Sequence, residues 1–172
     1  MIANNKISKR GLFTVALAAF LFLAGCATQL APTYDKSVVD GLNAANTDTM
    51  TLLALVSDGT KPEDYNSRAE KYATLIGKLD SLTILAGARP MPKNKVSDVV
   101  NKFLEKRGTT QIAEDDATPP SVHAIKKVSE TIEKIRNIDK KQGVTATEVF
   151  GFRGQVIIYL DQAITYENFL QR

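Results

Sequence analysis

The chain has 172 residues, of which 24% are charged and 44% hydrophobic, with one cysteine and one histidine. A single cysteine excludes an internal disulfide, and a single histidine leaves His-rich metal sites and a Ser-His-Asp arrangement poorly supplied. The formal charge of +3 comes from Lys6, Lys9 and Arg10, because the remaining 19 basic residues match the 19 acidic residues. Without these three residues the chain is neutral, so charge gives no reason to expect a nucleic-acid partner.

The N-terminal segment has the residue order of an export signal. Its three basic residues precede an uncharged, mostly apolar run from Gly11 to Gly25. This run of 15 residues is shorter than the roughly 20 that a transmembrane helix needs, so a retained membrane-spanning anchor is the weaker interpretation. We therefore expect residues 1–25 to be removed as a signal peptide.

The apolar run ends in Leu23-Ala24-Gly25-Cys26, which resembles the lipobox of bacterial lipoproteins over the first 26 residues of the chain. The resemblance implies that a signal peptidase recognises Leu23, Ala24 and Gly25 and cuts before Cys26. It also implies a diacylglyceryl group on the Cys26 thiol and an acyl chain such as palmitate on the new amine. Two or three chains anchor a protein stably, whereas one binds only marginally, at about 0.8 kcal/mol per buried CH2. The alternatives are an ordinary cleavage site with a free thiol and a small buried cysteine.

The residue after the cysteine is Ala27. In Gram-negative lipoproteins an aspartate at this position tends to retain the protein in the inner membrane, so alanine favours the outer membrane, facing the periplasm. We expect residues 26–33 to form a lipidated tether, of which Ala27 to Thr33 spans at most about 23 Å at ~3.3 Å per residue. The domain should then lie close to the membrane, and its partners should be membrane-proximal or come to it.

The rest of the chain, residues 34–172, is long enough for one domain with a real core. Its first predicted helix covers residues 34–57, where apolar or small residues recur at spacings of three and four. Gly59 is placed to end this helix. The predicted face consists of Val38, Leu42, Ala45, Thr49, Leu52 and Val56.

A second predicted helix repeats the same spacing between Tyr65 and Ala86 and stops at Gly87. Thr60 and Glu63 have the spacing of a reciprocal capping box at its start. After a proline-containing turn, residues 96–104 predict a short extra amphipathic helix. Residues 109–120 contain an acidic triplet, Glu114-Asp115-Asp116, and predict a solvated loop that lacks the ligand spacing of an EF-hand.

The third predicted helix starts at Pro119-Pro120 and stops at Gln142-Gly143. Its predicted apolar face consists of Val122, Ile125, Val128, Ile132, Ile135 and Ile138. The fourth opens with a second capping box, Thr145 and Glu148, and reaches the C-terminus. The β-branched run at 156–160 would also suit a strand, but the helical repeat continues on both sides of it.

The fourth helix carries an unusually wide apolar stripe. Phe150, Ile157 and Ile164 add to its main face, so we expect it to be the most buried helix. Gly151 and Gly154 resemble the Gly-x-x-Gly of RNA-binding loops only weakly, and close approach of a neighbouring helix explains them better. Together the elements predict an all-α fold, an antiparallel four-helix bundle with one short extra helix.

Nothing in the domain supplies a nucleophile with a base, a metal cluster or a phosphate cradle, so we expect no enzyme, no metal and no cofactor. His123 near the start of the third helix should be a surface or boundary residue. The five tyrosines suit the edge of the core better than an interface. Glu130 and Glu133 should form surface pairs with neighbouring basic residues.

The favoured hypothesis is an envelope lipoprotein that acts as a binding or assembly accessory for another envelope protein. Small helical lipoproteins of the secretin-pilotin kind are similar in size and organisation, although no motif after Ala27 identifies a family. The alternatives are an inhibitor or immunity-type lipoprotein with one tight soluble partner, and a carrier of a small apolar ligand. The carrier would need a cavity inside the bundle.

Overall fold

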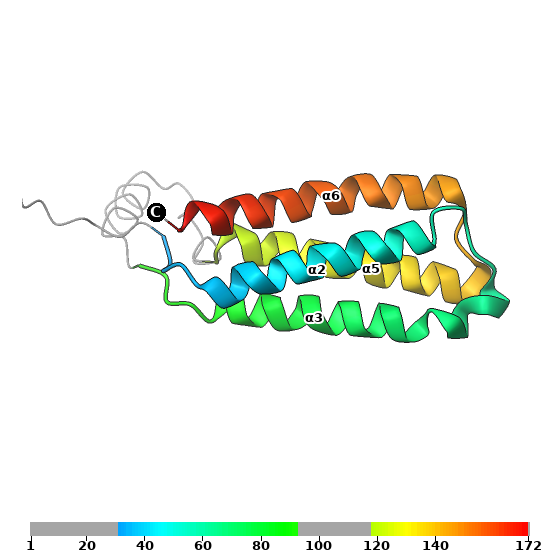
Figure 1. The fold of residues 1–172 in the computed structure, drawn as a ribbon, viewed down its shortest axis with the longest axis horizontal. Coiled ribbons are helices and arrows are strands. Elements are labelled where there is room, and N and C mark those ends of the chain that lie inside the picture. Colours follow the sequence, from blue (N-terminus) through cyan, green and yellow to red (C-terminus); the bar gives the residue numbers. More distant parts are fainter. Residues whose placement is uncertain (1–30, 93–117, 172) are drawn as a thin grey trace, which may run out of the picture.

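A computed structural model describes residues 31–92 and 118–171 and shows an all-α bundle (Figure 1). Its long helices are α2 (Lys36–Leu55), α3 (Ala69–Gly87), α5 (Pro120–Gln142) and α6 (Ala146–Phe169), and a 3-10 helix, η1 (Pro62–Ser67), precedes α3. The predicted all-α helical bundle is confirmed. The predicted short helix at 96–104 and the acidic triplet at 114–116 fall outside the described residues, and Pro120, the last residue of the predicted loop, begins α5.

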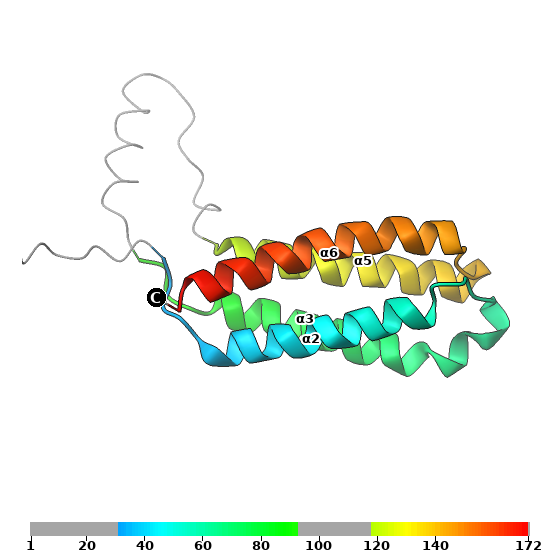
Figure 2. The same cartoon turned by 45° about the horizontal axis from the view of Figure 1, so that its top comes forward.

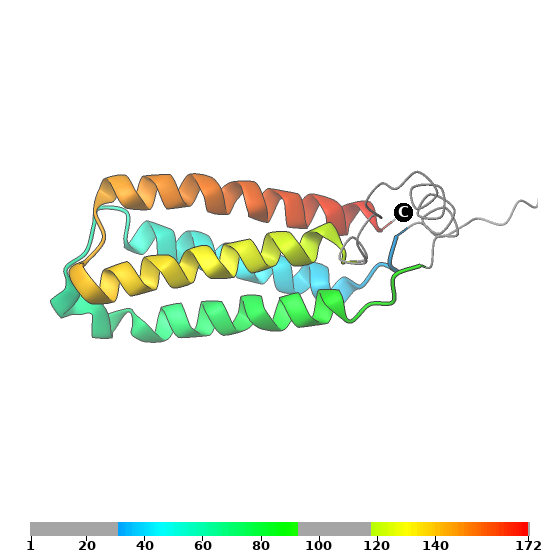
Figure 3. The same ribbon diagram turned by 180° about the vertical axis from the view of Figure 1, so that it is seen from behind.

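The four long helices run alternately up and down the bundle (Figures 1 and 2). α2 packs against α3 and α6, and α5 packs against the same two helices on the other side of the bundle (Figure 3). One end, here called the terminal end, holds the first described residues and the end of α6. The opposite or distal end holds the turns at 56–68 and 143–145.

One apolar core runs through the bundle, and the predicted helix faces supply it. All six predicted residues of the α2 face are buried, and α5 contributes Ile125, Val128, Ile132 and Ile135. Periodicity identified these residues because a side chain recurs on the same face every three or four positions. The run at 156–160 lies within α6, as the helical repeat predicts.

The two predicted capping boxes have opposite outcomes. The Thr145 hydroxyl accepts from the Glu148 N–H at 3.3 Å, and Glu148 accepts from the Thr145 N–H at 2.9 Å, which confirms the second box. The first box is wrong. No side-chain cap precedes η1, and the Thr60 hydroxyl instead donates to Asp139, 79 residues away. Thr60 thus makes a tertiary hydrogen bond to Asp139 in place of the predicted local capping bond.

The prediction that α6 is the most buried helix is also wrong. Phe150 is 81% exposed and Ile157 44%, because α6 packs only against α2 and α5 and its outward side meets neither. A Cβ added at Gly151 or Gly154 would meet nothing within 4 Å, so no helix of the described chain approaches these glycines. Part of the wide apolar stripe of α6 therefore faces solvent.

No helix among the described residues combines the length and the apolar character that crossing a membrane requires.

Candidate binding site at the distal end

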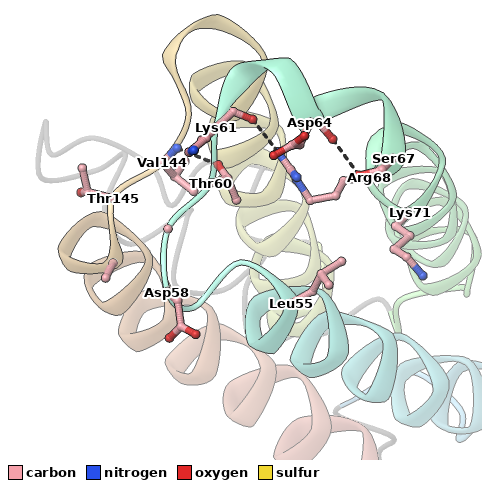
Figure 4. Close-up of a pocket in the computed structure, with 12 residues that line it drawn as sticks. Leu55, Asp58, Thr60, Lys61, Asp64, Ser67, Arg68, Lys71, Val144 and Thr145 are labelled. Atoms are coloured by element: carbon pink, nitrogen blue, oxygen red, sulfur yellow. Dashed lines mark hydrogen bonds between the residues drawn. The ribbon is translucent and has the colours of Figure 1, made fainter.

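A hollow of about 740 Å³ opens at the distal end of the bundle, where the end of α2, η1, the start of α3 and the start of α6 meet (Figure 4). We call it the distal hollow. Side chains from segments far apart in sequence border it. Those used below are Leu55, Asp58, Lys61, Asp64, Arg68 and Lys71.

Arg68 lines the distal hollow and forms a buried ion pair with Asp139 of α5. Arg68 donates from Nε to Asp139 Oδ2 at 2.9 Å and from Nη2 to Asp139 Oδ1 at 2.8 Å, and Asp139 is fully buried. The Thr60 hydroxyl donates to the same carboxylate at 2.5 Å, and Arg68 also donates to the Lys61 carbonyl at 3.1 Å. Bidentate pairing fixes the guanidinium geometrically. The pair thus joins α5 to the start of α3 and to the segment before η1.

The surroundings of Asp139 favour its ionised form. Burial alone would raise the pKa of this carboxyl, but the hydrogen bonds from Arg68 and Thr60 outweigh burial and hold the pKa below 3.8. Burial, followed by the negative charge of Asp139, raises the pKa of the Tyr72 hydroxyl. That hydroxyl is buried and makes no hydrogen bond of normal geometry within the described chain, so Tyr72 remains an uncharged phenol beside the pair.

The turn at Thr60 and the turn at 143–145 are hydrogen-bonded to each other beside the distal hollow. The Thr60 N–H donates to the Val144 carbonyl at 2.8 Å, and the Val144 N–H donates to the Thr60 hydroxyl at 2.9 Å. Gly143 has φ +77°, and a Cβ built there would lie 2.3 Å from the Thr60 carbonyl oxygen. Gly143 is therefore required twice, for its backbone conformation and for the close approach of the other turn.

Gly143→Ala should lower the free energy of unfolding by at least about 1–2 kcal/mol, because an L side chain is unfavourable at this φ and the turns must also separate. Urea titration followed by circular dichroism measures the change. The matched control is Gly77→Ala within α3, where an added Cβ meets nothing. There alanine should stabilise the helix by about 0.5–1 kcal/mol. Equal effects at both positions would contradict the role assigned to Gly143.

The rim of the distal hollow is charged and mixed in sign. Lys61 and Lys71 are exposed, as are Asp58 and Asp64, and Leu55 adds an exposed apolar side chain. The lining contains no cysteine or histidine, and its Thr60 and Ser67 hydroxyls already donate to Asp139 and to the Asp64 carbonyl. The rim therefore offers charges of both signs and one exposed apolar side chain.

A second hollow of about 550 Å³ continues from the first along the groove between α2 and α3. It shares Ser67 and Lys71 with the distal hollow and extends to Asp48 and Glu70. Asp48 forms an ion pair with Lys78 across this groove. The accessible surface at the distal end is therefore one continuous region over α2 and α3.

A different buried pair closes the terminal end. Arg89 donates from Nη1 and Nη2 to the two carboxylate oxygens of Glu167, at 2.7 and 2.5 Å. The Ser121 hydroxyl donates to Glu167 at 2.5 Å, and Arg89 Nε donates to the Ala86 carbonyl at 3.1 Å. Glu167 and Ser121 are fully buried. This cluster links α6, the start of α5 and the end of α3.

The site residues predicted from the N-terminal sequence, Leu23, Ala24, Gly25, Cys26 and Ala27, lie outside the described residues.

His123 is exposed, as predicted for a surface residue. Glu130 pairs with Lys127 and Glu133 with Arg136 on the surface of α5.

Four of the tyrosines lie half-buried at the edge of the core, and Tyr72 lies inside it. Within the described chain no three acidic, histidine or cysteine side chains gather as a metal site.

Periodicity missed the two buried ion pairs, Arg68 with Asp139 and Arg89 with Glu167. Comparison of the chain with protein-family models, with curated proteins and with solved structures gives no significant match.

Proposed function

We propose that this chain is an envelope lipoprotein, anchored through lipid on Cys26 to the outer membrane on its periplasmic side, and that it binds another envelope protein without catalysing a reaction. The lipobox Leu23-Ala24-Gly25-Cys26 carries this proposal, because its four positions follow a basic and then apolar export segment. The mixed rim of the distal hollow supports the binding role.

The geometry of the bundle is compatible with an anchor at Cys26. Five residue steps separate Cys26 from Ala31, a reach of at most about 17 Å, and residue 31 begins the terminal end. α5, with 23 residues, gives the bundle a length of about 35 Å. The distal hollow lies at the other end of this length from the anchor.

The test is affinity capture of the tagged full chain from gently cross-linked, detergent-solubilised envelopes, with mass spectrometry of its partners and of its own N-terminus. We expect an acylated Cys26 at the N-terminus and one envelope protein in near-stoichiometric amount. The double variant Lys61→Glu, Lys71→Glu should lower that capture about tenfold, because it reverses two charges on the rim. Lys126→Glu, an exposed lysine on α5 away from the rim, is the matched control.

The two parts of the proposal fail separately. An unmodified Cys26 would overturn the anchor, whatever is captured. If the double variant Lys61→Glu, Lys71→Glu captures the partner as strongly as the control Lys126→Glu does, the distal hollow is not the binding site. Capture of a soluble toxin or hydrolase through the same lysines would favour the inhibitor alternative.

A further inference from the structure

The outward side of α6 carries large apolar side chains that no described residue covers. Phe150 is 81% exposed, Ile158 57% and Ile157 44%. Ile158 lies opposite the buried residues Val149, Val156, Leu160 and Ala163, and Phe150 and Ile157 lie side by side about a quarter turn around the helix from them. With Gly151 and Gly154 they form a continuous face, here called the outer seam: Phe150, Gly151, Gly154, Ile157 and Ile158.

The two glycines of the outer seam make it suitable for a close helix partner. Each costs about 1 kcal/mol relative to alanine within a helix, and neither is needed for packing in the described chain, since an added Cβ meets nothing within 4 Å. Gly154 lies three residues before Ile157 and beside it on the helix surface, so a second helix can approach the α6 backbone there while Phe150 and Ile157 pack against it. The outer seam therefore fits a helix better than a loop or a flat surface.

We propose that the outer seam is the interface between two copies of this chain, whose α6 helices pack antiparallel around Ile157. The charges beside the seam carry the choice of a second copy. Arg153 and Asp161 are exposed, stand four residues on either side of Ile157, and have no ion-pair partner among the described residues.

Antiparallel pairing around Ile157 makes the seam complementary to itself. Arg153 of each copy then stands level with the partner's Asp161, about 6 Å along the helix from the two-fold axis, so the same pair forms twice. Parallel pairing in register would instead place Arg153 against the partner's Arg153 and Asp161 against the partner's Asp161. Charge thus selects the antiparallel dimer over the parallel one.

This arrangement places the two terminal ends at opposite ends of the dimer. If both copies are anchored in one membrane, as in the function proposed above, the bundles lie along its surface. The dimer itself does not depend on that anchor, so its test uses a chain from which Cys26 has been removed.

The test is disulfide cross-linking of the full chain carrying Cys26→Ser, in which an introduced cysteine is the only thiol. Ile157→Cys brings two thiols together near the two-fold axis and should yield a covalent dimer under mild oxidation in detergent. Ile84→Cys is the matched control, because Ile84 is also an exposed apolar residue in a long helix, 73% exposed, but lies on α3. We expect at least fivefold less covalent dimer from Ile84→Cys, since its thiols meet only by collision.

Charge exchange then tests the antiparallel register. Arg153→Asp alone and Asp161→Arg alone should each weaken the dimer about tenfold in sedimentation experiments, because each creates like-charge contacts twice. The double variant should regain the original affinity. Equal cross-linking at positions 84 and 157, a monomer at about 100 µM, or failure of the double variant to regain affinity would overturn the proposal. Cross-linking of position 157 to a different protein would also overturn it, in favour of a heterologous partner.

Discussion

Glu167→Ala is expected to lower the free energy of unfolding by about 3–5 kcal/mol, because it leaves the buried Arg89 guanidinium without its partner. Glu167 is fully buried and accepts three hydrogen bonds, two from Arg89 and one from Ser121. The variant would lose them all, and the space of the side chain would remain as a cavity. Urea titration measures the loss, which should also lower the melting temperature by on the order of 10 °C.

The matched control for this prediction is Glu130→Ala. Glu130 also forms an ion pair within the bundle, with Lys127 at 2.7 Å, but both side chains are substantially exposed. Solvent screens such a pair, so its removal should cost at most about 1 kcal/mol. If Glu167→Ala costs no more than Glu130→Ala, the cluster at the terminal end does not stabilise the bundle in the way that its burial indicates.

This cluster also ties down the start of the domain. Arg89 Nη1 lies 3.4 Å from the Thr33 carbonyl oxygen, which places the chain leading to α2 against the end of α3. Loss of Glu167 should therefore loosen residue 33 before the rest of the bundle. Hydrogen exchange should show faster exchange near the N-terminal end of α2 than at the distal turns.

The long helices were predictable because each depends on a local pattern. A helix buries one side, so apolar residues at spacings of three and four identify both the helix and its buried face. This reasoning placed the faces of α2 and α5 correctly. It failed for the outward half of α6, because periodicity shows that a face is apolar but cannot show which neighbour covers it.

The buried pairs were only partly predictable. Asp139 continues the buried spacing of Ile132 and Ile135, and Glu167 continues that of Leu160 and Ala163, so a carboxylate on an apolar face was a visible signal. Their partners were not visible, since Arg68 lies between η1 and α3 and Arg89 follows α3, outside any repeat. The pairs join residues 71 and 78 positions apart, a separation that no local pattern reports.

The misassigned role of Thr60 has the same origin. Its spacing from Glu63 satisfies the rule for a capping box, but a hydroxyl can serve a distant partner as well as a local one. Here the buried Asp139 carboxylate offers a charge-assisted hydrogen bond, which is stronger than a neutral cap. The hydrogen bond from Thr60 to Asp139 therefore became apparent only from the three-dimensional arrangement.

Asp139→Asn should destabilise the bundle most at neutral pH and progressively less in acid. The Asp139 pKa in the folded chain lies below its ordinary value of 3.8, so ionised Asp139 contributes stability at any pH above that value. The contribution is lost as pH falls through the lower, folded-state pKa. The variant has no charge at this position and leaves Arg68 unpaired at every pH, at a cost of about 3 kcal/mol at pH 7.

Urea titrations of the two chains at pH 7 and at several values below pH 4 test this prediction, because the gap in free energy of unfolding should narrow only in acid. Asp58→Asn on the exposed rim is the control, and it should change stability by at most about 0.5 kcal/mol throughout. If the difference in free energy of unfolding between the Asp139→Asn variant and the natural chain stays the same at the lowest pH, the Asp139 carboxylate does not contribute through its charge. The pair with Arg68 would then act at the distal end only by shape and hydrogen bonding.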